Sequence, residues 1–278
     1  MEKENIELKK EEYSRYSRNL FLKEIGVAGQ KKLKKSKVLV VGAGGLGGPL
    51  LYYLASSGVG NLSFVEYDIV DLTNLQRQIL YDTQSLGKKK SEVAYNKLHA
   101  LNPEIKIQTY SEKLNPENAF KIIENVDLVL DGSDNFYTRF LINDVCYFKK
   151  IPLISGGVLQ FYGLILGILP TETPCYRCLI EAPPETEENC STVGVLAPAT
   201  GIIGSLMAVE AIKYLLGIKP NIMNFIIRVD LLNLNFRKTK LPKNENCKLC
   251  GKNPLYKTFN PNLVDYWEVC RQSLFSIF

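Results

Sequence analysis

Histidine is almost absent from this sequence, and tryptophan and methionine are scarce. The chain has 278 residues, of which one is histidine, one is tryptophan and three are methionine. A Ser-His-Asp or Cys-His hydrolase uses a histidine as its general base. The single candidate, His99, falls in a stretch expected to be helical, where it is most simply a packing or C-terminal residue. The sequence therefore argues against a hydrolase of either class.

Long apolar runs are also missing. The N-terminus is polar and has no apolar core of signal-peptide length. No stretch reaches the roughly 18 uninterrupted apolar residues that a membrane span needs. Because 46% of the residues are hydrophobic and 23% are charged, the composition is that of a globular protein. We therefore expect a cytoplasmic protein without a membrane partner, and a formal net charge of +5 is too modest to demand a nucleic acid.

Cysteine is the residue type with the most informative spacing. Four of the seven cysteines form two Cys-x-x-Cys pairs, Cys175 with Cys178 and Cys247 with Cys250. This spacing presents two thiolates from one turn, and four thiolates complete the tetrahedral coordination of Zn²⁺. A redox dithiol is the alternative, but the presence of two pairs argues against it. Because no position is left for water, the predicted zinc site is structural and pins the C-terminal segment to the domain.

Three cysteines lie outside these pairs. Cys146 falls in an expected helix over residues 140–148 and is interpreted as a buried core residue. Cys190 lies in a polar, acidic stretch that we expect to be a loop over residues 180–200. A thiol in such a loop is either an accessible nucleophile or an incidental surface residue, and we keep the nucleophile as the working hypothesis. Cys270 is assigned no role.

Strand and helix patterns alternate through the first half of the chain. Apolar segments predict strands at residues 38–41, 62–66, 105–110, 127–130 and 152–154. Helices are expected between them, for example at residues 90–101 and 118–125. Such alternation is typical of βαβ units in a parallel sheet. Strands at 162–169 and 225–229, separated by an apolar helix at 201–216, are expected to extend that sheet in antiparallel fashion.

The predicted fold class is therefore α/β: a Rossmann-like, doubly wound, mostly parallel sheet extended by antiparallel strands, with a structural site of four cysteines. Three segments are expected along the chain. They are an N-terminal helical segment at residues 1–37, the sheet domain with its zinc site at 38–252, and a C-terminal tail at 253–278.

A glycine-rich loop joins the first predicted strand to the helix that follows it. Its sequence is Gly42-Ala43-Gly44-Gly45-Leu46-Gly47. Glycines let the backbone approach a phosphate closely, and a helix N-terminus favours negative charge. Glu66 ends the second predicted strand about 20 residues downstream, where an acidic side chain can accept hydrogen bonds from ribose hydroxyls. The loop and Glu66 predict a nucleotide site and leave both NAD and ATP open.

Polar side chains crowd the chain just beyond the predicted ribose site. They are Asp68, Asn74, Arg77 and Gln78. A hydride-transfer site has no need of such a group, whereas Arg77 with Lys90 could neutralise a triphosphate as pyrophosphate leaves. Asp134 follows another predicted strand, where its carboxylate could bind Mg²⁺. Each residue alone could be a surface residue, but together they favour ATP with Mg²⁺ over NAD.

Five motifs in this order resemble those of the MoeB/ThiF family of adenylyltransferases, which are relatives of the ubiquitin-activating enzymes. They are Arg15-Tyr16-Ser17-Arg18, the loop from Gly42 to Gly47, Asn74-Leu75-Gln76-Arg77-Gln78, Asp131-Gly132-Ser133-Asp134-Asn135, and the four paired cysteines. The resemblance extends over residues 13–254. It implies an enzyme that uses ATP to adenylylate the C-terminal glycine carboxylate of a ubiquitin-like β-grasp sulfur-carrier protein, ahead of thiocarboxylate formation.

The resemblance also implies roles for individual residues at the nucleotide. Glu66 would bind the ribose beside the glycine loop. Arg77, Gln78 and Lys90 would contact the phosphates. Asp134 would serve both the magnesium ion and the reacting carboxylate. The family usually has aspartate at the ribose position, and Glu66 is one methylene longer.

Two further roles are implied beyond the nucleotide. Arg18 would reach across a homodimer into the ATP site of the other subunit. Cys190 matches a loop cysteine that bonds covalently with the carrier in some members and is dispensable in others. Residues 264–267 resemble the stretch that leads to a rhodanese domain in longer relatives, and this sequence stops at Phe278. A sulfurtransferase, if needed, is therefore expected to be another protein.

Several alternatives stay open at this point. The carboxylate that is activated could belong to another peptide or to a small molecule. An NAD-dependent oxidoreductase, or a scaffold that only docks a ubiquitin-like protein, would also keep parts of the pattern. No motif decides between carriers that serve molybdopterin, thiamine or tRNA thiolation.

Overall fold

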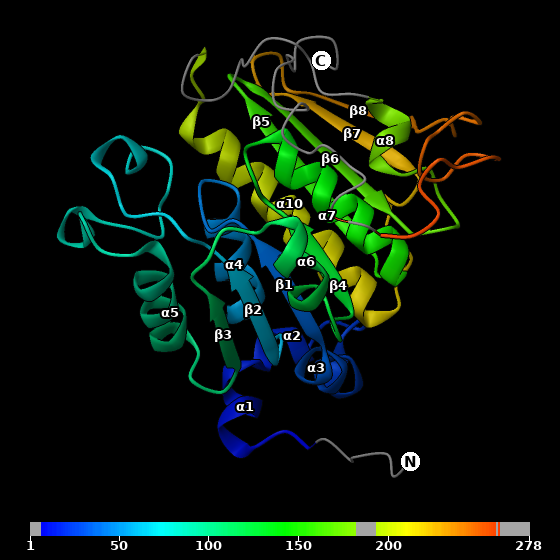
Figure 1. Cartoon of the computed structure of the whole chain (residues 1–278). Coiled ribbons are helices and arrows are strands. Elements are labelled where there is room, and N and C mark those ends of the chain that lie inside the picture. Colours follow the sequence, from blue (N-terminus) through cyan, green and yellow to red (C-terminus); the bar gives the residue numbers. More distant parts are fainter. Residues whose placement is uncertain (1–6, 182–192, 260, 262–278) are drawn as a thin grey trace.

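A single eight-stranded sheet forms the centre of the computed structural model, which describes residues 7–181, 193–259 and 261 (Figure 1). The strand order is β3-β2-β1-β4-β5-β6-β7-β8. The strands are β1 (Lys37–Val41), β2 (Asn61–Val65), β3 (Lys106–Tyr110), β4 (Leu128–Asp131), β5 (Leu153–Leu159), β6 (Tyr162–Ile168), β7 (Phe225–Asp230) and β8 (Asn235–Lys240). The first five in the spatial order are parallel, and β6, β7 and β8 continue the sheet in antiparallel pairing. The predicted α/β sheet with an antiparallel extension is confirmed.

Helices cover both faces of the sheet (Figure 1). One face carries α3 (Gly26–Lys35), α4 (Gly47–Ser56), α5 (Lys90–Leu101) and α10 (Ala197–Leu216); the other carries α6 (Pro116–Ile122), α7 (Phe136–Lys149) and α8 (Tyr176–Leu179). Val38 and Val40 of β1 pack against the first layer, whereas Leu39 and Val41 pack against the second. A strand buried on both faces is an unbroken aliphatic run, which is why the sequence predicts β1 so plainly.

The structure differs from the sequence prediction mainly on the antiparallel side. The sequence does not predict β8, because all six side chains are exposed and the strand lacks apolar alternation. β5 extends beyond the predicted end at 154, since its pairing with β6 continues to Leu159. α6 begins at Pro116, before the predicted 118, because the Asn115 side chain caps it by accepting hydrogen bonds from the backbone N–H groups of Glu117 and Asn118.

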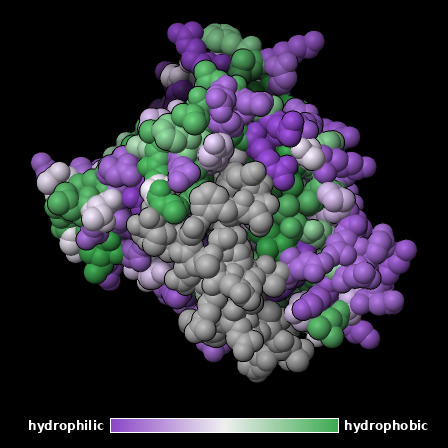
Figure 2. All heavy atoms as spheres, turned by 90° about the horizontal axis from the view of Figure 1, so that it is seen from above, coloured by the Kyte–Doolittle hydropathy of each residue, from purple (hydrophilic) through white to green (hydrophobic). Residues whose placement is uncertain are grey.

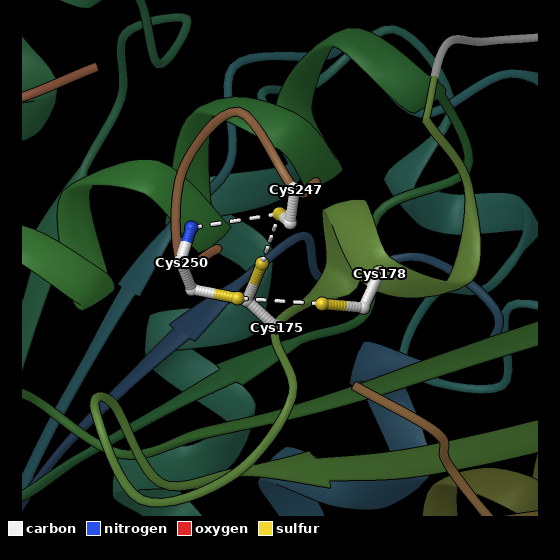
Figure 3. A group of neighbouring side chains, drawn as sticks. All are labelled: Cys175, Cys178, Cys247 and Cys250. Atoms are coloured by element: carbon white, nitrogen blue, oxygen red, sulfur yellow. Dashed lines mark hydrogen bonds between the residues drawn. The ribbon is translucent and has the colours of Figure 1, made fainter. Parts of the chain in front are cut away.

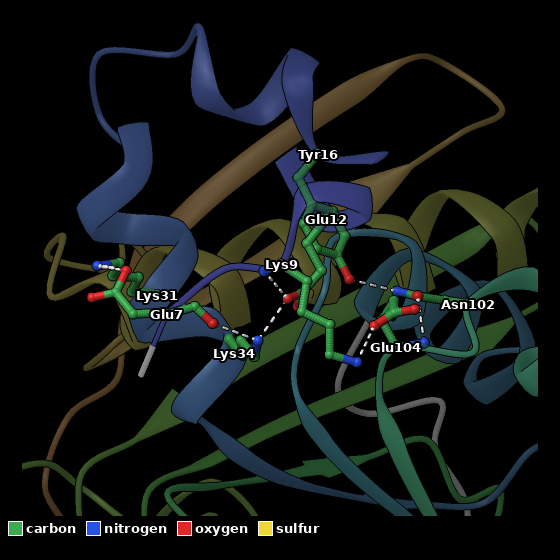
Figure 4. A network of polar contacts seen from close by, with 8 residues as sticks. All are labelled: Glu7, Lys9, Glu12, Tyr16, Lys31, Lys34, Asn102 and Glu104. Atoms are coloured by element: carbon green, nitrogen blue, oxygen red, sulfur yellow. Dashed lines mark hydrogen bonds and ion pairs between the residues drawn. The ribbon is translucent and has the colours of Figure 1, made fainter. Parts of the chain in front are cut away.

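The N-terminal segment is tied to the body by a network of polar contacts (Figure 4). It holds two short helices, α1 (Lys10–Arg15) and α2 (Ser17–Leu20). The buried Glu12 carboxylate accepts hydrogen bonds from the Lys9 backbone N–H at 2.7 Å and from Lys34 Nζ at 2.6 Å. The Tyr16 hydroxyl accepts a hydrogen bond from the Asn102 side chain at 2.9 Å. Within the predicted helical segment at 1–37, residues 10–15 and 17–20 form short helices that are anchored to α3 and to the end of α5.

α10 is long and apolar enough to cross a membrane, by length and composition alone. In the structure, 44% of its apolar window is buried. Ala199, Ile203 and Met207 are among its core residues, and the helix contacts β5 and β6. It serves here as the central helix of one layer of the fold, with Ile202 and Val209 exposed on its outer side.

Some sequence predictions fall on residues that the structure does not describe. Cys190 and most of the predicted loop at 180–200 lie outside the described residues. So do Cys270 and the part of the predicted tail from 262 onward. The proposed segment boundaries at 37 and 252 stay predictions.

Candidate functional site

A cleft opens at the carboxyl ends of the parallel strands, beside the glycine-rich loop. It lies at β1, where the strand order reverses: β2 and β3 lie on one side of β1, and β4 and β5 lie on the other. Open α/β sheets bind ligands at such a switch in strand order. Figure 2 views the molecule from above and shows hydrophilic side chains along much of its outline. The cleft gathers these predicted site residues: Gly42, Gly44, Gly45, Glu66, Asp68, Arg77, Gln78, Lys90 and Asp134.

The glycine loop makes a turn too tight for side chains at two positions. Gly42 has φ of +88°, a conformation that favours glycine. A Cβ on Gly47 would lie 1.8 Å from the Gly42 carbonyl oxygen. Gly47 is not part of the cleft wall, but it allows α4 to start directly behind the loop. The N-terminus of α4 consequently points toward the cleft, where it favours an anion.

Glu66 is buried in the cleft wall just after β2. Its carboxylate oxygens accept hydrogen bonds from the backbone N–H groups of Ala43 at 3.0 Å and Asp68 at 2.9 Å. Burial raises the pKa of the Glu66 carboxyl, while the two backbone hydrogen bonds and the nearby Lys90 oppose that shift. Each oxygen still has a lone pair, so the side chain can accept a hydrogen bond from a ligand hydroxyl.

Lys90 supplies a buried positive charge at the start of α5. Its side chain is 4% exposed, and Nζ lies 3.2 Å from Oδ2 of the half-exposed Asp68. Nζ also lies 6.0 Å from the centre of the Tyr81 ring. Because solvent screens a buried ammonium poorly, Lys90 can attract an anionic phosphate strongly.

Arg77 and Gln78 reach the cleft from the segment after the 3₁₀ turn η1 (Leu72–Asn74). Their backbone N–H groups donate to the Asn74 carbonyl at 3.1 and 3.0 Å. Asn74 itself is not part of the cleft wall, and its predicted contact with the nucleotide stays a prediction. Gln78 Oε1 is buried and lacks a hydrogen-bond partner among the described residues. Such an atom is expected where a ligand or water completes the site.

Asp134 is exposed at the mouth of the cleft, in the loop between β4 and α7. The residue after it, Asn135, caps α7 by accepting a hydrogen bond from the Thr138 backbone N–H at 2.9 Å. The residue before it, Ser133, is buried. Asp134 therefore projects from a short loop that is anchored at both ends.

Arg139 lines the cleft but is not predicted from the sequence. It is buried, and Nη2 donates to the Ser133 carbonyl at 2.5 Å. Nη1 donates to the Gly156 carbonyl at 2.7 Å. The only signal in the sequence is its place in the first turns of a helix that follows the Asp134 loop, and this position alone does not indicate that it would face the cleft.

The four paired cysteines come together in one cluster (Figure 3). All four Sγ atoms lie within 4.8 Å of one another. The Cys175 and Cys247 Sγ atoms are 3.6 Å apart, and those of Cys178 and Cys250 are 3.3 Å apart. Sulfur atoms bound tetrahedrally to zinc at about 2.3 Å would lie roughly 3.8 Å apart. The cluster therefore has the donor set and the size of a metal site, as the spacing predicts.

The cysteine cluster is joined to the cleft through α7. The Tyr176 backbone N–H donates to Asn143 Oδ1 on α7 at 2.8 Å. Burial raises the pKa of the Tyr176 hydroxyl to about 12, and the charge of the neighbouring Arg139 opposes the shift. The first turns of α7 contribute to the cleft, and its second half holds the segment between Cys175 and Cys178.

Arg18 does not line the cleft of its own chain. It is exposed on α2. The next residue, Asn19, donates a hydrogen bond to the Ser57 carbonyl at the end of α4, whereas the cleft lies at the start of that helix. A helix of 10 residues is about 15 Å long, so Arg18 and the cleft lie toward opposite ends of α4.

Comparison with known proteins gives the same assignment as the motifs. The model of the ThiF family matches residues 16–249. The sulfur carrier protein adenylyltransferase of Thermus thermophilus is 42% identical, with 94% of this chain and 97% of that protein covered. The adenylyltransferase and sulfurtransferase MOCS3 of Aedes aegypti is 44% identical over 95% of this chain, which spans 60% of that longer protein.

A solved structure shares the fold. A crystal structure of E. coli MccB with MccA-N7isoASN superposes with a TM-score of 0.76 at 24% identity, covering 86% of this chain and 75% of that one. At this identity the likeness concerns the fold alone. The family match and the Thermus thermophilus relative, which is matched along 97% of its length, show that this chain belongs to the ThiF family and is an adenylyltransferase.

Proposed function

We propose that this protein uses ATP to adenylylate the C-terminal carboxylate of a ubiquitin-like sulfur-carrier protein, releasing pyrophosphate. The observation that carries the proposal is a single cleft that combines the glycine loop, a buried acid at Glu66 and a buried cation at Lys90. The relative from Thermus thermophilus, whose name states this activity, is matched along nearly its whole length. The cleft is the site of the reaction in a cytoplasmic enzyme.

The nucleotide is held along the cleft wall. The ribose hydroxyls donate to the Glu66 carboxylate, whose oxygens each accept only one described hydrogen bond. The phosphates lie against the N-terminus of α4 and the Lys90 ammonium, with Arg77 beside them. The buried Oε1 of Gln78 places an amide group beside the glycine loop, where it can hydrogen-bond a bound water or ligand.

The chemical step needs no general base. A carboxylate oxygen of the carrier attacks the α-phosphorus of ATP, and the bond from that phosphorus to the bridging oxygen breaks as pyrophosphate leaves. The attacking group is already ionised, so the residues act by positioning and by stabilising charge. Arg77 and Lys90 stabilise the leaving pyrophosphate. The exposed carboxylate of Asp134 would hold Mg²⁺, which neutralises phosphate charge when it is bound.

Arg18 acts in a homodimer. It lies toward the end of α4 opposite its own cleft, so it can meet a cleft only in a second subunit. A two-fold axis perpendicular to the strands would bring the Arg18 end of one subunit beside the cleft end of the other. The exposed apolar side of α4 and α10 offers a face for such a contact, with Tyr53, Ile202 and Val209 exposed on it.

The cysteine cluster binds structural zinc. Four thiolates leave no open position for water, so the ion supplies cross-linking and no chemistry of its own. It fastens the segment around Cys247 and Cys250 to α8, and through α8 to α7.

Sulfur is added after activation. A separate sulfurtransferase supplies it, and Cys190 is the candidate thiol of this chain for a covalent bond to the activated carrier. Cys190→Ala is expected to leave carrier-dependent ATP–pyrophosphate exchange intact, because activation precedes any such bond. Loss of exchange in that variant would contradict this order of steps.

The decisive experiment is ATP–pyrophosphate exchange with Mg²⁺ and each small Gly-Gly-ended β-grasp protein of the source genome. Exchange with one carrier is expected. Asp134→Ala and Arg77→Ala should abolish it while the circular dichroism spectrum and melting temperature stay near those of the parent. Exchange with no carrier despite ATP binding would point to another carboxylate substrate, and binding of NAD would favour the oxidoreductase.

A further inference from the structure

Ser133, the residue before Asp134, is held by two buried side chains of opposite charge. Asp131 is 1% exposed and Arg139 is 7% exposed. Asp131 Oδ1 accepts hydrogen bonds from the Ser133 backbone N–H at 3.0 Å and from its hydroxyl at 2.6 Å. Arg139 Nη2 donates to the Ser133 carbonyl at 2.5 Å. The amide, the hydroxyl and the carbonyl of one residue are thus all fixed.

Ser155 of β5 joins the two charged side chains to each other. Its hydroxyl donates to Asp131 Oδ2 at 2.7 Å and accepts from Arg139 Nη1 at 3.4 Å. Nη1 also donates to the Gly156 carbonyl at 2.7 Å. The network therefore links the end of β4, the Asp134 loop, the first turns of α7 and strand β5.

Buried charges constrain structure strongly. A carboxylate and a guanidinium taken out of water are costly unless their hydrogen bonds are made, so the loop loses much by moving away from either group. Asn135 fixes the other side of the loop by capping α7. Asp134 is consequently an exposed residue on a backbone that is held by hydrogen bonds on both sides.

We propose that Asp131 and Arg139 are positioning residues of the adenylation step, which act through Ser133 and Ser155 to fix the backbone that carries Asp134. This inference rests on the proposed function, in which Asp134 serves Mg²⁺ and the reacting carboxylate. The contribution is geometric: a displaced Asp134 still lets ATP bind, but it no longer meets the metal and the carrier carboxylate together.

Direct contact between Arg139 and the substrate is the alternative role, and the Ser155→Ala variant distinguishes it from positioning through the network. It lines the cleft, and Gly157 beside it has no side chain to cover it; a Cβ there would lie 3.5 Å from Nη1. If the Arg139 charge contacts the substrate directly, removing the Ser155 hydroxyl should have no effect on catalysis. If Arg139 acts through the network, Ser155→Ala should weaken catalysis although the guanidinium is still present.

The experiment compares Arg139→Lys and Ser155→Ala with Arg177→Lys. Arg177 is the matched control, because it is equally buried, pairs with Asp144 and does not line the cleft. Arg139→Lys should lower kcat for carrier-dependent exchange about 10- to 100-fold and raise the Mg²⁺ concentration for half-maximal rate, with a near-normal KM for ATP. Ser155→Ala should also lower kcat and raise the Mg²⁺ concentration for half-maximal rate, but by smaller factors. Arg177→Lys should lower the melting temperature only.

A second readout does not depend on activity. Hydrogen exchange of the backbone amides at residues 132–135 should be faster in Arg139→Lys and Ser155→Ala than in the parent or in Arg177→Lys. Unchanged loop exchange would overturn the inference, as would parental kcat and Mg²⁺ dependence in both variants. If the parent shows no ATP–pyrophosphate exchange with any carrier, the proposed function fails. The hydrogen-exchange measurement then still decides whether the network fixes residues 132–135.

Discussion

The Arg177 guanidinium pairs with the Asp144 carboxylate through two buried hydrogen bonds, from Nε to Oδ1 at 2.8 Å and from Nη2 to Oδ2 at 2.6 Å. The Arg177 guanidinium carbon also lies 4.6 Å from the centre of the Phe140 ring and 5.2 Å from that of Tyr256. Because Arg177 stands between Cys175 and Cys178 in sequence, this pair fastens the cysteine cluster to α7.

Removing one charge of this pair should be costly. Asp144→Asn leaves the Arg177 charge buried with weaker partners, and we expect the free energy of unfolding to fall by about 3–5 kcal/mol. Urea unfolding followed by circular dichroism measures this. Asp82→Asn is the control, because the side chains of Asp82 and its partner Lys97 are 50% and 30% exposed, so solvent screens this pair and the change should matter little. Equal losses in the two variants would argue against a special role for the buried pair.

Loss of one thiolate should release the metal. Cys247→Ser is expected to lower the zinc content from one ion per chain toward zero and to reduce the melting temperature, since a cross-link of the C-terminal segment is lost. Elemental analysis of the purified protein measures the metal. Cys146→Ala is the matched control, because Cys146 is buried in the core away from the cluster. Parental zinc content in Cys247→Ser would contradict the ligand set.

Two glycines of the loop should respond differently to alanine. In Gly47→Ala the new Cβ would be 1.8 Å from the Gly42 carbonyl oxygen, so the loop must move and stability should fall. In Gly44→Ala the nearest atom is the Gln78 side-chain nitrogen at 3.4 Å, so the fold should persist while the methyl group weakens ATP binding from within the cleft. Melting curves and ATP titration separate the two effects. A stable Gly47→Ala protein would contradict the close approach.

The buried Glu66 should give stability a pH dependence. Its folded pKa is raised by burial above the ordinary value of 4.5, so the folded state holds the proton to higher pH than the unfolded state does. Stability from this group is therefore fully present below that value and is lost as pH rises through the folded pKa. Glu66→Gln removes the titration. This substitution should lower the free energy of unfolding more at about pH 4.5 than at about pH 8. Urea unfolding at both pH values measures the difference. A loss of stability that is independent of pH would contradict the raised pKa.

Local patterns in the sequence predict much of the fold and part of the site. The aliphatic run at 38–41 is buried on both faces, so every residue contributes to the signal for β1. β8 gives no such signal, because it is an exposed edge strand held by its pairing with β7. The sequence does not predict that Arg139 lines the cleft either, because the position of its side chain depends on how α7 packs beside β5.

The sequence by itself determined the chemistry that this protein carries: a glycine loop with a downstream acid, a cluster of cations and carboxylates beside it, and four thiolates in two pairs. These depend on residue type and short spacing, which the chain states directly. Only the tertiary structure decided which groups meet. It gathered Lys90 and Asp134 into one cleft, left Asn74 outside its wall, placed Arg18 toward the end of α4 opposite the cleft, and closed the buried network around Ser133. Such contacts join residues brought together by strand order and helix packing, and no local pattern encodes them.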